Sequence, residues 1–128
     1  MGLTRAQIKS RINSLTKQKS NYISERTKYK KSLSYGNKLL NSLKNSKGYL
    51  SSSNDYLRKY FTINGKTADS GKINKTTESL NNIIKNLNNT IIPEINNSIN
   101  NLNSKINRTD REISNLKRQL DTAEIWFK

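Results

Sequence analysis

The sequence predicts an all-α protein, an antiparallel two-helix hairpin of coiled-coil type that is kinked near Pro93. Apolar residues recur at alternating steps of four and three, and one glycine-containing break separates two arms of equal length. The composition agrees, because hydrophobic residues make up only 31% of the 128 and mean hydropathy is −0.91. So polar a chain cannot enclose a three-dimensional core, but it can fill the narrow seam between two helices.

The first helix is expected from about residue 4 to about residue 58, because the apolar period holds there without a slip. No proline interrupts it, and Gly36 and Gly48 weaken it by about 1 kcal/mol each relative to alanine. Ten of its fifteen seam positions are apolar: Ile8, Ile12, Leu15, Lys19, Tyr22, Arg26, Tyr29, Leu33, Gly36, Leu40, Leu43, Lys47, Leu50, Asn54 and Leu57.

Residues 59–72 have no helical period and are expected to form a loop. Asn64-Gly65 is a strong turn signal in this stretch, and a second glycine follows at Gly71. Phe61 and Ile63 are apolar, so the loop is expected to pack against the ends of the helices.

The second helix is expected from about residue 73 to about residue 125, which makes residues 1–128 a single domain. Its apolar period slips once, since Leu87, Ile91, Ile95 and Ile99 follow one another in steps of four. Such a stutter unwinds a supercoil locally, and Pro93 inside it removes a backbone hydrogen bond. We therefore expect a bend near residues 90–94.

Folding the chain about its loop gives an approximate register. Leu15 then lies opposite Leu116, and Gly36 lies opposite Pro93 and Glu94. The helix-one glycine is thereby expected to make room for the bend in helix two.

The seam is interrupted by polar residues, and the apolar face is too wide for one partner helix. Lys19, Arg26, Lys47 and Asn54 all occupy seam positions. A face of this width usually packs on two helices, which predicts a further helical partner. The residues expected to bind it are Tyr35, Leu39, Tyr49, Leu50, Tyr56, Leu57, Phe61 and Ile63.

The residue types needed for catalysis are missing or scattered. The chain has no histidine and no cysteine, and its nine acidic residues form no obvious pair. Gly65-Lys66-Thr67 resembles the end of a phosphate-binding loop, but Tyr60 stands where that loop needs a glycine. We therefore expect a non-enzymatic chain without cofactor or metal. With neither an apolar span nor a signal peptide, it is expected in the cytoplasm.

The net charge of +15 is concentrated in the first arm. Residues 1–72 carry 16 basic and 3 acidic residues, or +13, whereas residues 73–128 carry 8 and 6, or +2. An acidic protein partner would suit this polycation. Two alternatives stay open at this point: sequence-independent nucleic-acid binding by a basic helical hairpin, and a homodimeric coiled-coil scaffold.

A few residues near the tip and near Pro93 resemble a known family. Ile63-Asn64-Gly65 falls where the WXG-type proteins of type VII secretion carry Trp-x-Gly at the hairpin tip, with isoleucine in place of tryptophan. Residues 57–66, 69–73 and 91–96 resemble the small helical proteins encoded beside LXG-domain toxins in Gram-positive bacteria.

This resemblance implies a function. Such small proteins bind the helical N-terminal region of the toxin and help to target it to the secretion machine, in one elongated bundle that can include a second small helical protein. The Tyr-x-x-x-Asp/Glu export signal is missing near the C-terminus, where neither Asp121 nor Glu124 has an aromatic residue four positions earlier. The resemblance thus implies an adaptor or chaperone whose partner carries the export signal, with co-secretion as the alternative.

Overall fold

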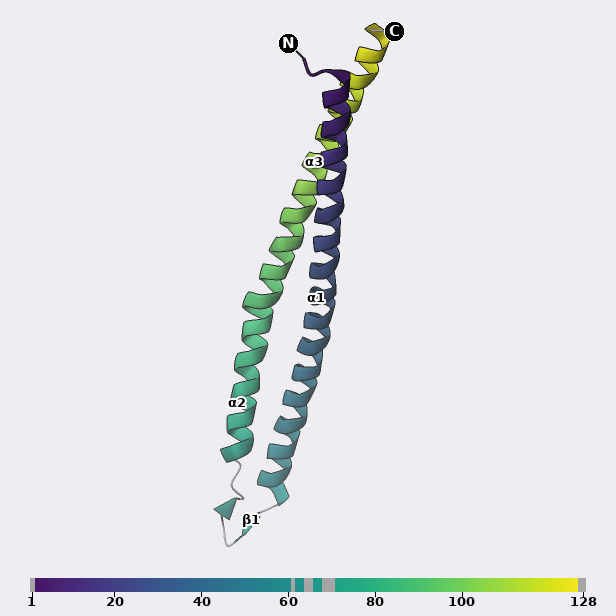
Figure 1. Ribbon diagram of the computed structural model, residues 1–128. Helices are drawn as coiled ribbons and strands as arrows, with labels where there is room; N and C mark the ends of the chain where they lie inside the picture. The colour runs from purple at the N-terminus through teal and green to yellow at the C-terminus, as the bar shows by residue number, and fades with distance from the viewer. Residues whose placement is uncertain (1, 61, 64–65, 68–70, 127–128) are drawn as a thin grey trace. The chain divides into compact units, whose positions relative to one another are not determined.

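The computed structural model describes residues 2–60, 62–63, 66–67 and 71–126, and almost all of these residues are helical. The predicted all-α class is therefore confirmed. The elements in chain order are the helix α1 (Arg5–Tyr60), the strands β1 (Thr62–Ile63) and β2 (Lys66–Thr67), the helix α2 (Gly71–Asn86), the π-helix η1 (Leu87–Ile91) and the helix α3 (Ile92–Trp126) (Figure 1).

The start of α1 is set by a capping box. The backbone N–H of Gln7 donates to the Thr4 hydroxyl oxygen at 3.2 Å, and the backbone N–H of Thr4 donates to the Gln7 side-chain carbonyl at 2.9 Å. Two of the N–H groups that a helix start leaves without partners are satisfied in this way. Thr4 is thus the cap, and the helix begins at Arg5.

The segment between the long helices is shorter and more regular than the loop expected at residues 59–72. α1 continues to Tyr60, and α2 begins at Gly71. β1 and β2 pair in antiparallel fashion, Thr62 with Thr67 and Ile63 with Lys66. A two-residue strand shows no detectable period, so the sequence could not reveal it. Phe61 and the expected turn at Asn64-Gly65 lie outside the described residues.

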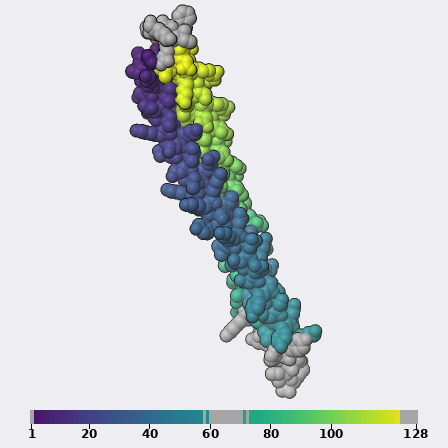
Figure 2. Space-filling view, turned by 90° about the vertical axis from the view of Figure 1, so that its right-hand side faces the viewer, coloured from purple at the N-terminus to yellow at the C-terminus, as the bar shows by residue number. Residues whose placement is uncertain are grey.

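Two compact units make up the chain. Unit 1 combines Met1–Lys31 with Asn96–Lys128, and unit 2 is the continuous stretch Ser32–Ile95. In unit 1 the first half of α1, purple in Figure 2, lies beside the yellow-green end of α3. In unit 2 the second half of α1 is grouped with α2, η1 and the first residues of α3.

The predicted seam of α1 is confirmed by burial. We name heptad positions a to g, with Leu40 at a and Leu43 at d. Of the fifteen predicted a and d residues, fourteen are buried or half-buried. The exception is Tyr29, which is 37% exposed. Alternating steps of four and three keep one stripe of the helix against its neighbour, which explains why the spacing alone located these positions.

The seam of the second arm departs from the prediction at the π-helix. Ile91 was expected on the seam but is 40% exposed. Ile92 occupies the seam position instead, because its side chain is the nearest neighbour of Gly36, a seam residue of α1. A π-turn accommodates one extra residue, and the Ile92 N–H accordingly donates to the Leu87 carbonyl five positions back. From Leu87 the seam therefore takes one step of five to Ile92, then resumes steps of three and four.

The two units differ in the number of buried residues among those whose side-chain burial the structure describes. In unit 1 these are Ile8, Ile99, Leu102, Ile106, Thr109, Ile113 and Leu116. In unit 2 they are Gly36, Leu40 and Leu87. Opposite the α3 core of unit 1, α1 places long side chains such as Lys19 and Arg26, whose aliphatic stems can cover apolar surface.

Candidate protein-interaction surface

One side of the seam, the e edge, is occupied by polar contacts. Lys19 Nζ lies 2.6 Å from an Asp110 carboxylate oxygen, and the Arg26 guanidinium donates to Asn103 Oδ1 at 2.9 Å. Each contact joins an a residue of α1 to an e residue of α3. From the first of these contacts to the second, the chain advances seven residues along α1 and returns seven residues along α3.

Unit 2 has a contact of the same kind. Asn54, at an a position of α1, donates through Nδ2 to Oδ1 of Asn74, at an e position of α2, at 3.0 Å. From the Gly36–Ile92 contact to this one, the chain advances eighteen residues along α1 and returns eighteen along the second arm. The e edge of each unit is thus bridged by polar side chains.

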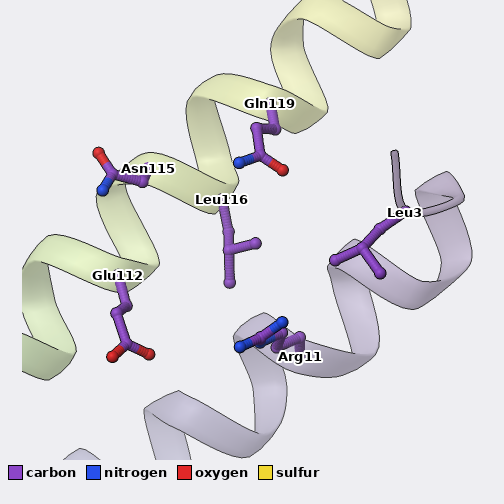
Figure 3. A pocket seen from close by; sticks show the side chains of 6 residues that line it. All are labelled: Leu3, Arg11, Glu112, Asn115, Leu116 and Gln119. Atoms are coloured by element: carbon purple, nitrogen blue, oxygen red, sulfur yellow. The ribbon is translucent and has the colours of Figure 1, made fainter. Parts of the chain in front are cut away.

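The opposite side of the seam, the g edge, carries shallow hollows in unit 1. The hollow in Figure 3 is lined by Leu3, Arg11, Glu112, Asn115, Leu116 and Gln119. Leu116 points from α3 toward α1, and Leu3 approaches from before the start of α1 (Figure 3). Arg11, Glu112 and Gln119 all stand at g positions, so g residues of both helices flank the same edge.

Two further hollows follow the same edge of unit 1. One is lined by Gln18 of α1 and by Lys105 and Glu112 of α3, and the other by Glu25 of α1 and Ser98 of α3. These residues again occupy g positions. The g edge of unit 1 is therefore lined by basic, acidic and amide side chains, which suits contact with water.

The equivalent positions in unit 2 carry no charge. The g residues of α1 there are Ser32, Leu39, Ser46, Ser53 and Tyr60, and those of the second arm are Thr76, Ile83 and Ile91. Leu39 is 51%, Ile83 50% and Ile91 40% exposed. A helical edge without charge, next to exposed apolar side chains, is unusual in a chain with 33 charged residues, 24 basic and 9 acidic.

The predicted partner-binding residues divide into two groups. Tyr35 is 69%, Leu39 51%, Tyr49 73% and Tyr56 56% exposed. Leu50 and Leu57, in contrast, are half-buried at seam positions. Ile63 lies in β1, whereas Phe61, Asn64 and Gly65 lie outside the described residues, so only Ile63 of the predicted tip motif is placed.

The tyrosines sit beside the uncharged g residues. Tyr35, Tyr49 and Tyr56 are all at c positions, which lie next to g on the helix surface. With g residues they form one stripe at steps of three and four, which we call the serine–tyrosine stripe: Ser32, Tyr35, Leu39, Ser42, Ser46, Tyr49, Ser53 and Tyr56. α1 in unit 2 thus carries a second stripe, parallel to its seam.

A hollow opens on this stripe near the end of α1. Among the described residues it is lined by Tyr49, Ser52, Ser53, Tyr56 and Leu57 of α1. A concave apolar spot between two tyrosines is a suitable seat for one apolar side chain of a partner.

Basic residues border the stripe. The f positions of α1 in unit 2, which adjoin the c positions of the stripe, include Lys38 and Lys59, and none of them is acidic. The Lys38 ammonium lies 6.0 Å from the centroid of the Tyr35 ring, at the outer limit of a cation–π contact. The stripe is therefore an uncharged strip with a cationic border.

Metal-ligand groups and membrane spans were sought among the described residues. These residues hold no group of three His, Cys, Asp or Glu that could ligate a metal ion. None of the helices in the described part of the chain is both long and apolar enough to cross a bilayer. Comparisons with protein-family models, with curated proteins and with solved structures find no match.

Part of this surface was not predicted from the sequence. The predicted partner-binding residues include the tyrosines and Leu39 but neither the serines between them nor Ile83 and Ile91 on the other arm. The sequence indicates this surface only by the lack of charged residues at the alternating steps of three and four from Ser32 to Tyr56. This indication is weak, because a serine in a helix usually shows only that the position is exposed.

Proposed function

We propose that this chain is an antiparallel helical hairpin that acts as a non-catalytic adaptor, binding the helical N-terminal region of an LXG-type toxin before type VII secretion. The observation that carries the proposal is the uneven exposure of apolar side chains. Of eight large hydrophobic residues exposed in the described part of the chain, six belong to unit 2. Apolar surface of this kind marks protein-binding sites.

The hairpin itself is supported by the contact pairs within each unit. The pairs Lys19–Asp110 and Arg26–Asn103, separated by one heptad on each helix, fit two helices that run in opposite directions. The proposed bend near Pro93 is supported by the preceding π-turn, since such turns commonly accompany kinks.

The test is production of the chain together with the protein encoded by the adjacent gene, followed by size-exclusion chromatography. We expect the two proteins to elute as one complex of higher mass. Tyr35→Lys combined with Tyr49→Lys should abolish this elution, while the matched change Asn37→Lys, also on the surface of α1, should leave it intact. A chain that elutes alone in the presence of its neighbour would overturn the proposed function.

Binding to nucleic acid is the second candidate, favoured by the net charge of +15 and an isoelectric point near 10.2. Electrophoretic shift assays with duplex and single-stranded DNA over a salt series test it. Submicromolar affinity with a steep salt dependence would favour this candidate over the adaptor. Weak binding that disappears near physiological salt would reflect net charge alone.

A further inference from the structure

We propose that the g edge of unit 2 accepts one acidic amphipathic helix, which packs along the serine–tyrosine stripe in heptad register and completes a three-helix bundle in that unit. The inference deepens the proposed function and rests on it, because it specifies the partner's chemistry and the edge on which it lies.

The two edges of the seam differ in what covers them. Polar contacts bridge the e edge in both units, as in Lys19–Asp110 and Asn54–Asn74. The g edge is where the hollows of unit 1 are found, between g residues of opposing helices. The contact pairs of unit 2 follow the same pattern, so its g residues Leu39 and Ile83 flank one edge from two sides. That edge is open to a third helix.

The pattern of the stripe matches a helical partner. Its eight residues follow one another at steps of three and four, the spacing of a coiled-coil seam. The length from Ser32 to Tyr56 corresponds to about 36 Å of helix. Serines between tyrosines leave gaps into which knobs of a neighbouring helix can insert, and the hollow at Tyr49 and Tyr56 is one such gap. A helix with its own apolar heptads matches this surface.

The charges beside the stripe select the kind of helix. Lys38 and Lys59 border the stripe at f positions of α1. A partner helix with Glu or Asp beside its apolar stripe would meet these lysines. A second copy of the chain would instead bring two cationic borders together, each on a molecule of net charge +15. Acidic helices are therefore accepted, and self-association is disfavoured.

The probes are three synthetic peptides of about 28 residues, four heptads each. The acidic peptide has Leu at a and d and Glu at e and g, the basic peptide has Lys in place of Glu, and the third has the acidic composition in permuted order. Binding to the full chain is measured by fluorescence anisotropy at physiological salt. We expect the acidic peptide to bind and the basic one to bind at least about tenfold more weakly. The permuted peptide should not bind.

A matched pair of variants locates the site. Ser46 lies on the stripe and Ser51 on the e edge, both are exposed, and both are on α1. Ser46→Glu buries an unpaired acid beside the acidic helix and should weaken binding by about tenfold or more. Ser51→Glu should change affinity by less than about twofold. Ile83→Glu tests the other flank of the edge, and we expect it to weaken binding like Ser46→Glu.

Several outcomes would overturn the inference. If all three peptides fail to bind, or if Ser46→Glu and Ser51→Glu have equal effects, the edge is not an acceptor for an acidic helix. Because the chain lacks cysteine, Ser46→Cys introduces a single thiol. Rapid formation of a disulfide-linked dimer by Ser46→Cys, but not by Ser51→Cys, would identify a second copy as the occupant. The peptides replace the natural partner, so their failure would leave the co-production test standing, and failure of that test would not affect the peptide result.

Discussion

The two interior glycines of α1 differ in what surrounds them. A Cβ added at Gly48 would meet no atom within 4 Å, whereas one added at Gly36 would lie 3.5 Å from Cγ1 of Ile92. Gly36 is buried and Gly48 is exposed. The residue at position 36 therefore contributes to packing in unit 2, and the residue at position 48 affects only the helix itself.

Gly48→Ala should raise the free energy of unfolding by about 1 kcal/mol, because alanine loses less backbone entropy than glycine in a helix. Thermal unfolding followed by circular dichroism measures the change as a rise in Tm of several degrees. Gly36→Ala should also be tolerated, since 3.5 Å is an ordinary contact distance.

Substitution by leucine should distinguish the packing at positions 36 and 48 more clearly than substitution by alanine. Gly36→Leu should overpack against Ile92 and destabilise by about 1–3 kcal/mol, whereas Gly48→Leu has open space. Equal Tm values for the two leucine variants would contradict the packing assigned to Gly36.

At the scale of elements, the π-helix η1 compensates for an extra residue in the second arm. Leu87 and Ile92 both reach the seam although five positions separate them. Pro93 follows directly, where it has no N–H to donate and its ring would clash with a regular helical carbonyl four residues earlier. The wider π-turn relieves that clash and restores the register at the same place.

Deleting Asn89 in a Pro93→Ala background should therefore be tolerated. The step of five from Leu87 to Ile92 becomes a step of four, so an unbroken α-helix would keep both seams in register. We expect helicity to be kept and stability to change by less than about 1 kcal/mol, because Asn89 is exposed. Circular dichroism with thermal unfolding measures both quantities.

Deletion of Asn101 in the same background is the control. Asn101 is also exposed but lies in regular α-helix within α3. Its loss rotates every later seam residue by about 100° and should remove most of the unfolding cooperativity of unit 1. Similar melting curves for the two deletions would show that the π-turn has no role in register.

At the scale of the whole molecule, charge opposes folding. The 24 basic residues outnumber the acidic ones by 15, and the Lys19–Asp110 pair is too exposed, at 33% and 46%, to contribute more than about 1 kcal/mol. Repulsion among cations therefore dominates the electrostatics of the isolated chain. An acidic partner would remove this repulsion as well as cover the stripe.

The stability of the isolated chain should thus increase with salt. Raising sodium chloride from about 10 mM to about 300 mM shortens the screening length several-fold and should raise Tm by several degrees. A variant with Lys28, Lys30 and Lys31 changed to Gln has a net charge of +12, from +15 minus 3, and should show a smaller increase. A Tm that falls with salt would mean that specific ion pairs outweigh the net repulsion.

The sequence by itself determined the helices and the seam. The spacing from Ile8 to Leu57 predicted which side chains are buried, because a heptad period is a local property that any partner helix must respect. The bounds of α1 were also predicted to within one or two residues. The departure of Tyr29, 37% exposed, is the exception along this helix.

Only the tertiary structure decided how the stutter is absorbed and which edge is left open. Unwinding of the supercoil and a π-turn both satisfy the spacing around Leu87, and the contact of Ile92 with Gly36 selects the second. The e edge is bridged by pairs such as Arg26–Asn103, far apart in the chain, which a periodic pattern cannot assign. Which residues are buried in the seam follows from the local heptad period. Which contacts form along each edge of the seam depends on the pairing of segments that are distant in the chain.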